Sequence, residues 1–279
     1  MTPKPPLPAL RVTDSTLVLP GRAPLAVRIY GKKPAGAAVP LVLHLHGGAF
    51  VAGSLDCGAC LAQLVAGAGA VVVSLAYPLA PAHPFPQAVE AAYAGIEWVY
   101  KHRHKLAGKD APVYVAGEEA GGNLAAAVAV VARDRAHPPL AGQILVAPML
   151  DPCTAMPSQR EAMGEATGCK WADGWQHYLR GPMDAEHPYA VPAHAQRLAD
   201  LPPALVLTGA DDAMRDEALA YAERLRKAGI AVTSGVLDDR TGWPDTLGEP
   251  PSDECACGAA VQQHLRAFFG ASRPPPPPS

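Results

Sequence analysis

Several features are scarce in this chain of 279 residues, and each absence excludes a class of protein. Charged residues make up only 18% of the sequence, and 23 Lys and Arg against 26 Asp and Glu leave a formal net charge of −3. Without a basic stripe, the chain is not expected to bind nucleic acid or an anionic membrane surface. No apolar run approaches the roughly 20 residues of a membrane span. The N-terminal residues lack the apolar core of a signal peptide, so a cytoplasmic location is expected.

Cysteine is also scarce, with six residues, too few for a disulfide scaffold at this length. Four of them fall in two close pairs, Cys57 with Cys60 and Cys255 with Cys257. If the fold brought the pairs together, they could bind a metal or form disulfides, but a Cys-x-Cys spacing is tight for zinc. Use of a small residue in an Ala-rich chain is the favoured interpretation, and neither a metal nor a cofactor is predicted.

What the chain does contain is an alternation of short apolar runs with longer Ala- and Leu-rich stretches. Strands are predicted at 25–30, 40–46, 70–77, 112–117, 143–148, 204–209 and 231–237, with an antiparallel edge strand at 11–18. Helices are predicted at 57–67, 85–104, 119–135, 215–228 and 252–269. From residue 40 onward most strand segments are nearly continuous hydrophobic runs, as expected when helices cover both faces of a sheet. The alternation implies an α/β protein with a mostly parallel, doubly wound sheet.

One segment, 151–194, breaks this rhythm and carries a helix predicted around 170–179. It is expected to form a small helical cap over the carboxyl ends of the strands, where open α/β sheets bind ligands. The N-terminal residues are a second candidate contributor to this cap. The prediction is a single domain over 1–270, followed by a Pro-rich, disordered tail at 271–279. Trp171 and Trp175 would share one face of the cap helix, where they either roof a pocket or only fasten the cap.

Three short blocks carry the motifs that bear on chemistry. The first, HGGAF at 46–50, follows a strand, and its glycines would let backbone N–H groups converge on a bound oxyanion. The second, YPLAPAHPFP at 77–86, follows the next strand. The third, VAGEEAGGNL at 115–124, combines a strand, a sharp Gly-flanked turn and a helix start, which is the geometry of a nucleophile elbow.

In this order and spacing, together with the segment 201–216, the blocks resemble the hormone-sensitive-lipase (HGGG) family of α/β-hydrolase esterases. The resemblance covers about residues 40–269 and implies the α/β-hydrolase fold, with ester hydrolysis by a Ser-His-Asp triad. It also implies an oxyanion hole formed by the backbone of Gly47, Gly48 and Ala120.

The sequence departs from this family at two of the three triad positions. The family's elbow, Gly-Asp-Ser-Ala-Gly-Gly, is Gly-Glu-Glu-Ala-Gly-Gly here, so the resemblance puts Glu119 at the position of the nucleophile. Thr241 matches the position of the base histidine, and Asp212 matches that of the acid. Ordinary serine esterase activity should therefore be lost.

Glu119 would lie at the N-terminus of a helix, which favours an anion, whereas the neighbouring charges of Glu118 and Asp212 disfavour one. Its carboxylate could occupy the oxyanion hole itself, act as a general base or pair with a cationic ligand. Covalent attack by the carboxylate is a less favoured alternative, because the base that would activate water for the second step is missing. Without the imidazole, a gap is expected between Glu119 and Asp212, because Thr241 is too short to fill it. We expect a water molecule or a donor group of the ligand in that gap.

The rest of the predicted substrate site consists of side chains near these motifs. Its members are His44, Glu118, Trp171, Trp175 and Trp243, although simple packing beside the site is the favoured role of His44. The expected partner is a small-molecule substrate or ligand, and a homodimer is compatible with the sequence.

Three functions remain open on these residues, because a fold alone does not determine a function. The favoured one is an enzyme that has abandoned hydrolysis and uses Glu119 for an elimination, isomerisation or cyclisation beside a retained oxyanion hole. The second is a non-catalytic pseudo-esterase that binds a small molecule. The third is an unusual carboxylic-ester hydrolase.

Overall fold

The computed structural model describes residues 10–19, 21, 23–153, 155–163, 169–238, 241–248 and 257–271. Its centre is an eight-stranded sheet in the order β1-β2-β4-β3-β5-β6-β7-β8. The strands are β1 (Val12–Leu17), β2 (Leu25–Tyr30), β3 (Leu41–Leu45), β4 (Val71–Leu75), β5 (Val113–Glu118), β6 (Gly142–Val146), β7 (Ala204–Gly209) and β8 (Val232–Leu237). β2 runs antiparallel to both of its neighbours, and every other pair is parallel.

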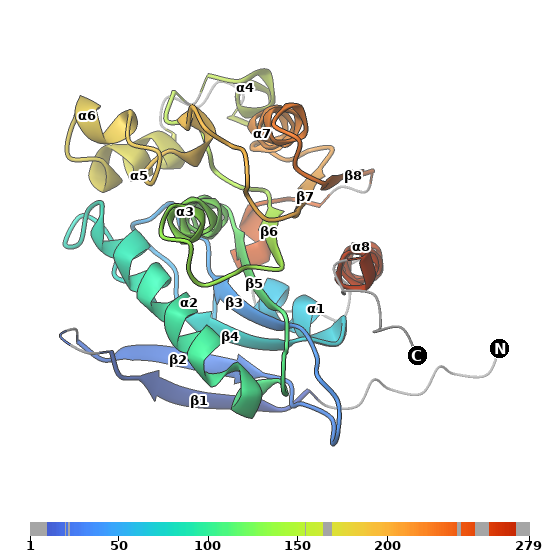
Figure 1. Ribbon diagram of the computed structural model, residues 1–279. Coiled ribbons are helices and arrows are strands. Elements are labelled where there is room, and N and C mark those ends of the chain that lie inside the picture. Colours follow the sequence, from blue (N-terminus) through green and yellow to red (C-terminus); the bar gives the residue numbers. More distant parts are fainter. Residues whose placement is uncertain are drawn as a thin grey trace.

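Helices cover both faces of this sheet (Figure 1). α2 (Gln87–Leu106), α3 (Ala120–Asp134) and α7 (Arg215–Lys227) pack on one face, and α1 (Ala59–Gly67) and α8 (Gly258–Ala271) pack on the other. All residues of the central strands β3, β4, β5, β6 and β7 are buried, which explains their continuous apolar runs. No described helix is both long and apolar enough to cross a membrane.

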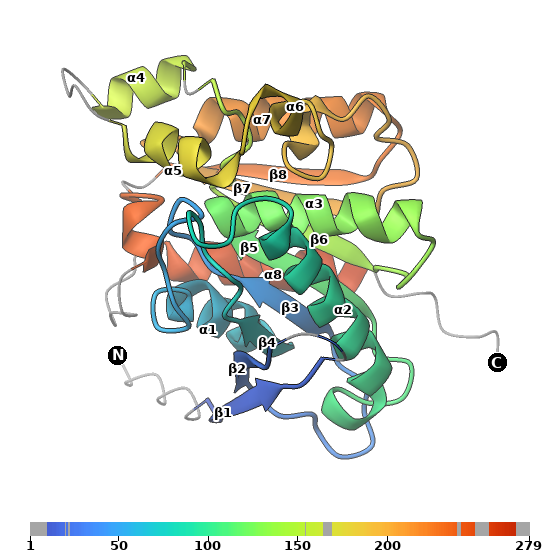
Figure 2. The same ribbon diagram turned by 90° about the vertical axis from the view of Figure 1, so that its left-hand side faces the viewer.

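The segment between β6 and β7 holds α4 (Pro157–Met163), α5 (Lys170–Tyr178), α6 (Pro182–Ala185) and the 3-10 helix η1 (Pro192–His194). Figure 2 shows α4 and α5 lying together at one end of the molecule. α5 packs tightly on the loop that follows β3, since a Cβ on Gly174 would lie 2.3 Å from the carbonyl oxygen of Ala49. The segment therefore covers the carboxyl end of β3.

The predicted fold class is confirmed, including the antiparallel edge strand and the parallel core. The sequence analysis missed α4 and α6, which are short, and it began the last helix at 252. Residues 249–256 lie outside the described residues, as do the predicted tail from 272 onward and residues 1–9. The second 3-10 helix, η2 (Asp245–Gly248), follows β8.

Close backbone contact fixes where α3 meets the sheet. A Cβ on Gly121 would lie 2.0 Å from the carbonyl oxygen of Leu45, and one on Gly117 would lie 2.1 Å from the carbonyl oxygen of Gly121. No real Cβ tolerates such distances to backbone, so glycine at both positions lets α3 start directly against β3 and β5. The turn between β5 and α3 is consequently held within reach of the loop after β3.

The substitution Gly121→Ala should destabilise the fold by about 3 kcal/mol or more, because the backbone at Leu45 has to move. Urea unfolding measures this. The control is Gly270→Ala near the end of α8, where a Cβ meets nothing within 4 Å and the helix propensity of Ala favours a neutral or stabilising effect. Equal free energies of unfolding for the two variants would contradict the close-approach argument.

Candidate active site

The loop after β3 has an unusual backbone that turns its amides toward one point. Gly48, Ala49 and Phe50 have φ angles of 119°, 48° and 66°, so two non-glycine residues stand in the left-handed region. Tyr77 supports the start of the loop. Its hydroxyl donates to the carbonyl oxygen of His46 at 2.7 Å, and its ring stacks on the ring of His46. Burial lowers the pKa of His46 and raises that of Tyr77, so both side chains serve as neutral supports.

Glu119 forms the turn between β5 and α3 and is itself strained. Its φ and ψ are 51° and −119°, outside the ordinary regions for a residue with a side chain. The backbone is fixed from β6, because the amide of Glu119 donates to the carbonyl oxygen of Val146 at 3.2 Å and its own carbonyl accepts from the amide of Met149 at 2.9 Å. β3 and β5 are parallel neighbours, so this turn lies beside the loop after β3.

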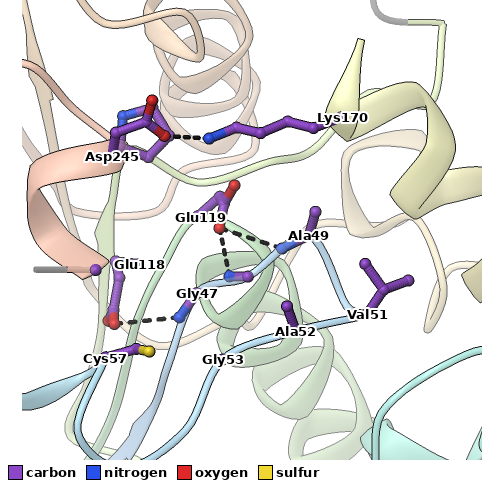
Figure 3. Close-up of a pocket in the computed structure, with 13 residues that line it drawn as sticks. Gly47, Ala49, Val51, Ala52, Gly53, Cys57, Glu118, Glu119, Lys170 and Asp245 are labelled. Carbon is purple, nitrogen blue, oxygen red and sulfur yellow. Dashed lines mark hydrogen bonds and ion pairs between the residues drawn. The ribbon is translucent and has the colours of Figure 1, made fainter. Parts of the chain in front are cut away.

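The Glu119 carboxylate is hydrogen-bonded to backbone amides of that loop (Figure 3). Its Oε2 accepts hydrogen bonds from the amide of Gly48 and, at 3.2 Å, from that of Ala49, while Oε1 accepts from Trp171 Nε1 at 2.7 Å. A side chain at Gly47 would collide with it, since a Cβ there would lie 2.8 Å from Oε2. Three N–H donors on one carboxylate form an anion-binding arrangement of the kind that stabilises an oxyanion.

Glu118, the residue before Glu119, accepts a hydrogen bond from another amide of the same loop, that of Gly47. Its Oε1 accepts from the amide of Gly47 at 3.2 Å, and its Oε2 lies 2.7 Å from His44 Nε2. The other ring nitrogen of His44 lies 2.9 Å from the hydroxyl oxygen of Ser74. All three side chains are buried, so His44 does pack beside the site, and it also contacts one of its carboxylates.

A cavity of about 370 Å³ opens above the loop and contains parts of both carboxylates. Its wall comes from the loop after β3, the start of α5 and the segment after β8. The lining residues are Gly47, Gly48, Ala49, Val51, Ala52, Gly53, Cys57, Glu118, Glu119, Lys170, Pro244, Asp245 and Gly248. An ion pair between Lys170 and Asp245 joins α5 to η2 across this cavity (Figure 3). Apart from its four charged side chains the wall is mainly apolar, which suits a small organic molecule.

Thr241 is bonded to Asp211, the neighbour of the acid predicted from the sequence. Asp211 Oδ1 accepts from the amide and the hydroxyl of Thr241 at 3.0 and 2.8 Å, and Oδ2 accepts from the amide of Gly242 at 3.0 Å. Burial alone would raise the pKa of Asp211, but these hydrogen bonds hold it below its usual value. The polar contact of Thr241 is therefore with Asp211, and the sequence analysis had considered only Asp212.

Asp212 lies deeper. Its carboxylate accepts from the hydroxyl of Thr208 and, at 2.8 Å, from the amide of Met214. Burial raises the pKa of Asp212 to about 6, although both hydrogen bonds oppose the shift. Asp212 and Glu119 thus each have protein donors of their own, and neither depends on the bridging donor expected from the sequence.

The structure brings some predicted residues together and separates others. Glu119 is bound by Gly48 and by Ala49, which was not predicted, whereas the amide of Gly47 is donated to Glu118. Ala120 begins α3 directly after Glu119. Of the predicted tryptophans, Trp171 contacts Glu119, whereas Trp175 packs on the ring of Phe50 and Trp243 lies in the core cluster on the side of α1 and α8.

The cysteine pairs can be placed only in part. Cys57 lines the cavity, and Cys60 and Cys257 are buried in the core between α1 and α8. Cys255 lies outside the described residues. Within the part of the chain that is described, no group of three or more His, Cys, Asp or Glu side chains could hold a metal ion.

Lys170 and Asp245 are charged cavity residues that sequence reasoning missed. They lie far apart in the sequence, and one flanks a segment outside the described residues. The only available signal was that Lys170 precedes Trp171 in a helix expected to cover the site. No sequence signal indicated that Thr241 would bond to Asp211 and not to Asp212. Two adjacent aspartates cannot be distinguished in this respect until the direction of the backbone is known.

A double-mutant cycle tests the bond between the cap and the turn. Trp171→Phe removes the N–H donor but keeps a ring, and Glu119→Ala removes the carboxylate. Because hydrogen bonds to charged groups are strong, the cycle should give a coupling of about 1–3 kcal/mol in urea unfolding. Additive effects of the two substitutions would show that the contact contributes nothing to stability.

The raised pKa of Asp212 predicts a pH dependence of stability. Its folded pKa of about 6 exceeds the unfolded value, so the folded state binds the proton more tightly and loses stability as pH rises from about 4 to about 6. For each protein, the decrease in the free energy of unfolding between pH 4 and pH 7 is compared. This decrease should be roughly 2 kcal/mol smaller in Asp212→Asn than in the unsubstituted chain, because the variant lacks the titrating carboxyl group. Urea titrations at the two pH values provide the comparison. Parallel pH dependences would contradict the raised pKa.

Comparison with known proteins identifies relatives of this chain. A family model described as α/β hydrolase fold matches residues 42–241. The chain is 40% identical over 233 residues to Esterase LipI of Mycobacterium tuberculosis, covering 81% of this chain and 72% of the relative. It is 35% identical over 237 residues to Carboxylesterase NlhH of the same species, covering 83% and 74%. The crystal structure of a thermostable esterase from Pseudomonas putida superposes with a TM-score of 0.81 at 31% identity, covering 95% of this chain and 84% of that one.

These relatives overturn the favoured function from the sequence analysis. An elimination, isomerisation or cyclisation was expected, yet relatives at 35% and 40% identity are named carboxylesterase and esterase. The expectation of a non-hydrolytic enzyme is therefore wrong, and the binding-protein alternative is no better supported. The parallel sheet, the turn at Glu119 and the family match over residues 42–241 together show that this chain belongs to the α/β-hydrolase fold family.

Proposed function

We propose that this chain is a carboxylic-ester hydrolase in which carboxylates replace the usual serine and histidine chemistry. In this proposal Glu119 stands at the position of the family's nucleophile and Thr241 at that of its base. The esterase relatives support the reaction class. The observation that carries the proposal is the position of the Glu119 carboxylate, with one oxygen on the amides of Gly48 and Ala49.

That position supports our proposal of a preformed oxyanion hole. The same N–H donors can stabilise a carboxylate oxygen and the oxygen of a tetrahedral ester intermediate, because each is a negatively charged oxygen bonded to carbon. Gly48 and Ala49 already present their amides to such an oxygen, and the positive φ angles of the loop fix their direction. An ester carbonyl that entered the cavity would find the donors in place.

Glu119 must leave these amides before an ester carbonyl can use them. The bond from Trp171 to the other carboxylate oxygen gives the displaced side chain a donor to keep, so the carboxylate can turn away without losing every partner. Ester binding thus competes with an internal ligand, and the apparent affinity for substrate is lowered by the fraction of molecules in which the hole is filled.

The hydrolysis that we propose is attack by water. The ester carbonyl oxygen accepts hydrogen bonds from the amides of Gly48 and Ala49. A water molecule then adds to the ester carbonyl carbon and gives one of its protons to a carboxylate of the cavity. The tetrahedral intermediate then breaks its bond to the alcohol oxygen, and the same proton passes to the departing alkoxide. The products are a carboxylic acid and an alcohol, and the carboxylate is regenerated.

The substrate that suits the cavity is a small ester. The volume is about 370 Å³, and the wall beside the loop is apolar, with Val51 and Pro244 among its members. The ion pair of Lys170 with Asp245 borders the cavity on the side of α5. A short acyl chain fits these dimensions better than a long one.

Hydrolysis of p-nitrophenyl acetate tests the proposal. The purified chain should release p-nitrophenol over many turnovers, at a rate well above the same protein after heat denaturation. The double variant Glu119→Ser with Thr241→His should raise kcat/KM by about 100-fold or more, because it introduces a serine hydroxyl as nucleophile and an imidazole as its general base. An inactive chain would overturn the proposed function, and an unimproved double variant would overturn the positions assigned to Glu119 and Thr241.

A further inference from the structure

Glu118 is the second carboxylate of the cavity, and the proposed hydrolysis leaves open which carboxylate accepts the proton. The two glutamates are adjacent in the sequence but are held in different ways. Glu119 is bound to groups that the substrate itself needs, the amides of Gly48 and Ala49. Glu118 is bound to Gly47 and to a buried histidine behind the loop.

Glu118 ends a hydrogen-bonded array that crosses three neighbouring strands. Ser74 on β4 and His44 on β3 are partners in the sheet register, and β5, which ends at Glu118, lies on the other side of β3. The array runs from the Ser74 hydroxyl to His44 Nδ1 at 2.9 Å, and from His44 Nε2 to Glu118 Oε2 at 2.7 Å. Ser74 and His44 are completely buried, so only the Glu118 end of the array reaches the cavity.

The structure makes Glu118 a fixed group. His44 cannot move within a fully buried strand, and Gly58 packs directly against it, since a Cβ there would lie 2.8 Å from the His44 ring. With Oε2 directed at His44, Oε1 faces the amide of Gly47 at the long distance of 3.2 Å. Oε1 therefore retains lone-pair capacity for a further donor, and Glu118 is part of the cavity wall.

We propose that Glu118 is the general base of the hydrolysis and that His44 is the residue that positions it. This rests on the proposed function. A water molecule on Glu118 Oε1 would lie beside the ester carbon when the ester oxygen occupies the amides of Gly48 and Ala49. As the water oxygen bonds to that carbon, its O–H bond breaks and the proton moves to Oε1. The proton returns to the alkoxide as the C–O bond of the ester breaks.

Preorganisation favours Glu118 over Glu119 in this role. A base contributes most when it is already placed before the substrate arrives. Glu118 keeps both of its partners when an ester binds, because the Gly47 amide and His44 Nε2 are hydrogen-bonded to Glu118 and not to the carboxylate oxygen of Glu119 that an ester displaces. Glu119 has to change position in the same event, so on this account it is an internal competitor of the substrate.

Substitution of the two glutamates tests the proposal because the expected effects have opposite signs. Glu118→Gln should lower kcat for p-nitrophenyl acetate by about 100-fold or more with little change in KM. Glu119→Ala should raise kcat/KM by about 10-fold, since it empties the oxyanion hole. The matched control is Glu217→Gln, a glutamate that is equally buried but lies outside the cavity, on α7. It should hydrolyse the ester at the unsubstituted rate.

Two further variants separate catalysis from a structural effect. Glu118→Asp keeps a carboxylate and should retain more activity than Glu118→Gln, while thermal unfolding shows whether each protein is folded. His44→Gln keeps an N–H donor, whereas His44→Phe keeps only bulk, so kcat should fall further in the Phe variant, with KM unchanged in both. Equal kcat values in these two variants would remove the positioning role of His44.

The outcomes distinguish failure of this proposal from failure of the proposed function. If the unsubstituted chain hydrolyses the ester and Glu118→Gln does so within threefold of it, as a folded protein, Glu118 is not the base. If Glu119→Ala is folded but abolishes hydrolysis, Glu119 takes part in the reaction as base or nucleophile and the proposal is overturned. If the unsubstituted chain does not hydrolyse the ester, the proposed function itself fails, and this assignment fails with it.

Discussion

The contact between the Glu119 carboxylate and the amides of Gly48 and Ala49 is the interaction on which the site depends. It joins the turn after β5 to the loop after β3, and through Trp171 it joins both to the cap helix α5. One carboxylate side chain thus satisfies three N–H donors, two of which belong to residues that line the cavity. In the proposed function the same donors bind the ester oxygen, so that one interaction would both stabilise the site and limit its use.

The sheet creates this contact by placing two strained segments side by side. β3 and β5 are parallel neighbours, and Gly121 lets α3 start against the backbone of β3. The positive φ angles of Ala49, Phe50 and Glu119 lie on the two facing segments, where neighbouring hydrogen bonds hold them. Strain at this place is consistent with a functional site, because strained backbone persists only where the surrounding structure fixes it.

Much of the fold could be predicted from the sequence, because short apolar runs alternate with longer Ala- and Leu-rich stretches along most of the chain. The apolar runs that became β3 to β7 are fully buried, as the pattern of strands covered on both faces predicts. The short helices α4 and α6 were missed because a helix of four to seven residues carries too little periodicity to detect.

The site could be located from its motifs but not resolved to atoms. The turn at Glu119 and the glycine loop were recognisable, and filling of the oxyanion hole was one of the alternatives considered. Which amide meets which carboxylate depends on loop dihedral angles that sequence does not encode locally, so the division between Gly47 and Ala49 was missed. The same holds for Thr241, which bonds to Asp211. The reaction was misjudged because an expected change of the triad was taken to mean a changed reaction class, whereas the relatives are named esterases.

The central claim is that the Glu119 carboxylate occupies an oxyanion hole from which an ester displaces it. A crystal structure with a small trifluoromethyl ketone, an ester analogue that forms a tetrahedral hydrate, tests this most directly. The account predicts an oxygen of the analogue on the amides of Gly48 and Ala49, with Glu119 turned away toward Trp171. An analogue bound in the cavity while Glu119 still holds both amides would contradict it.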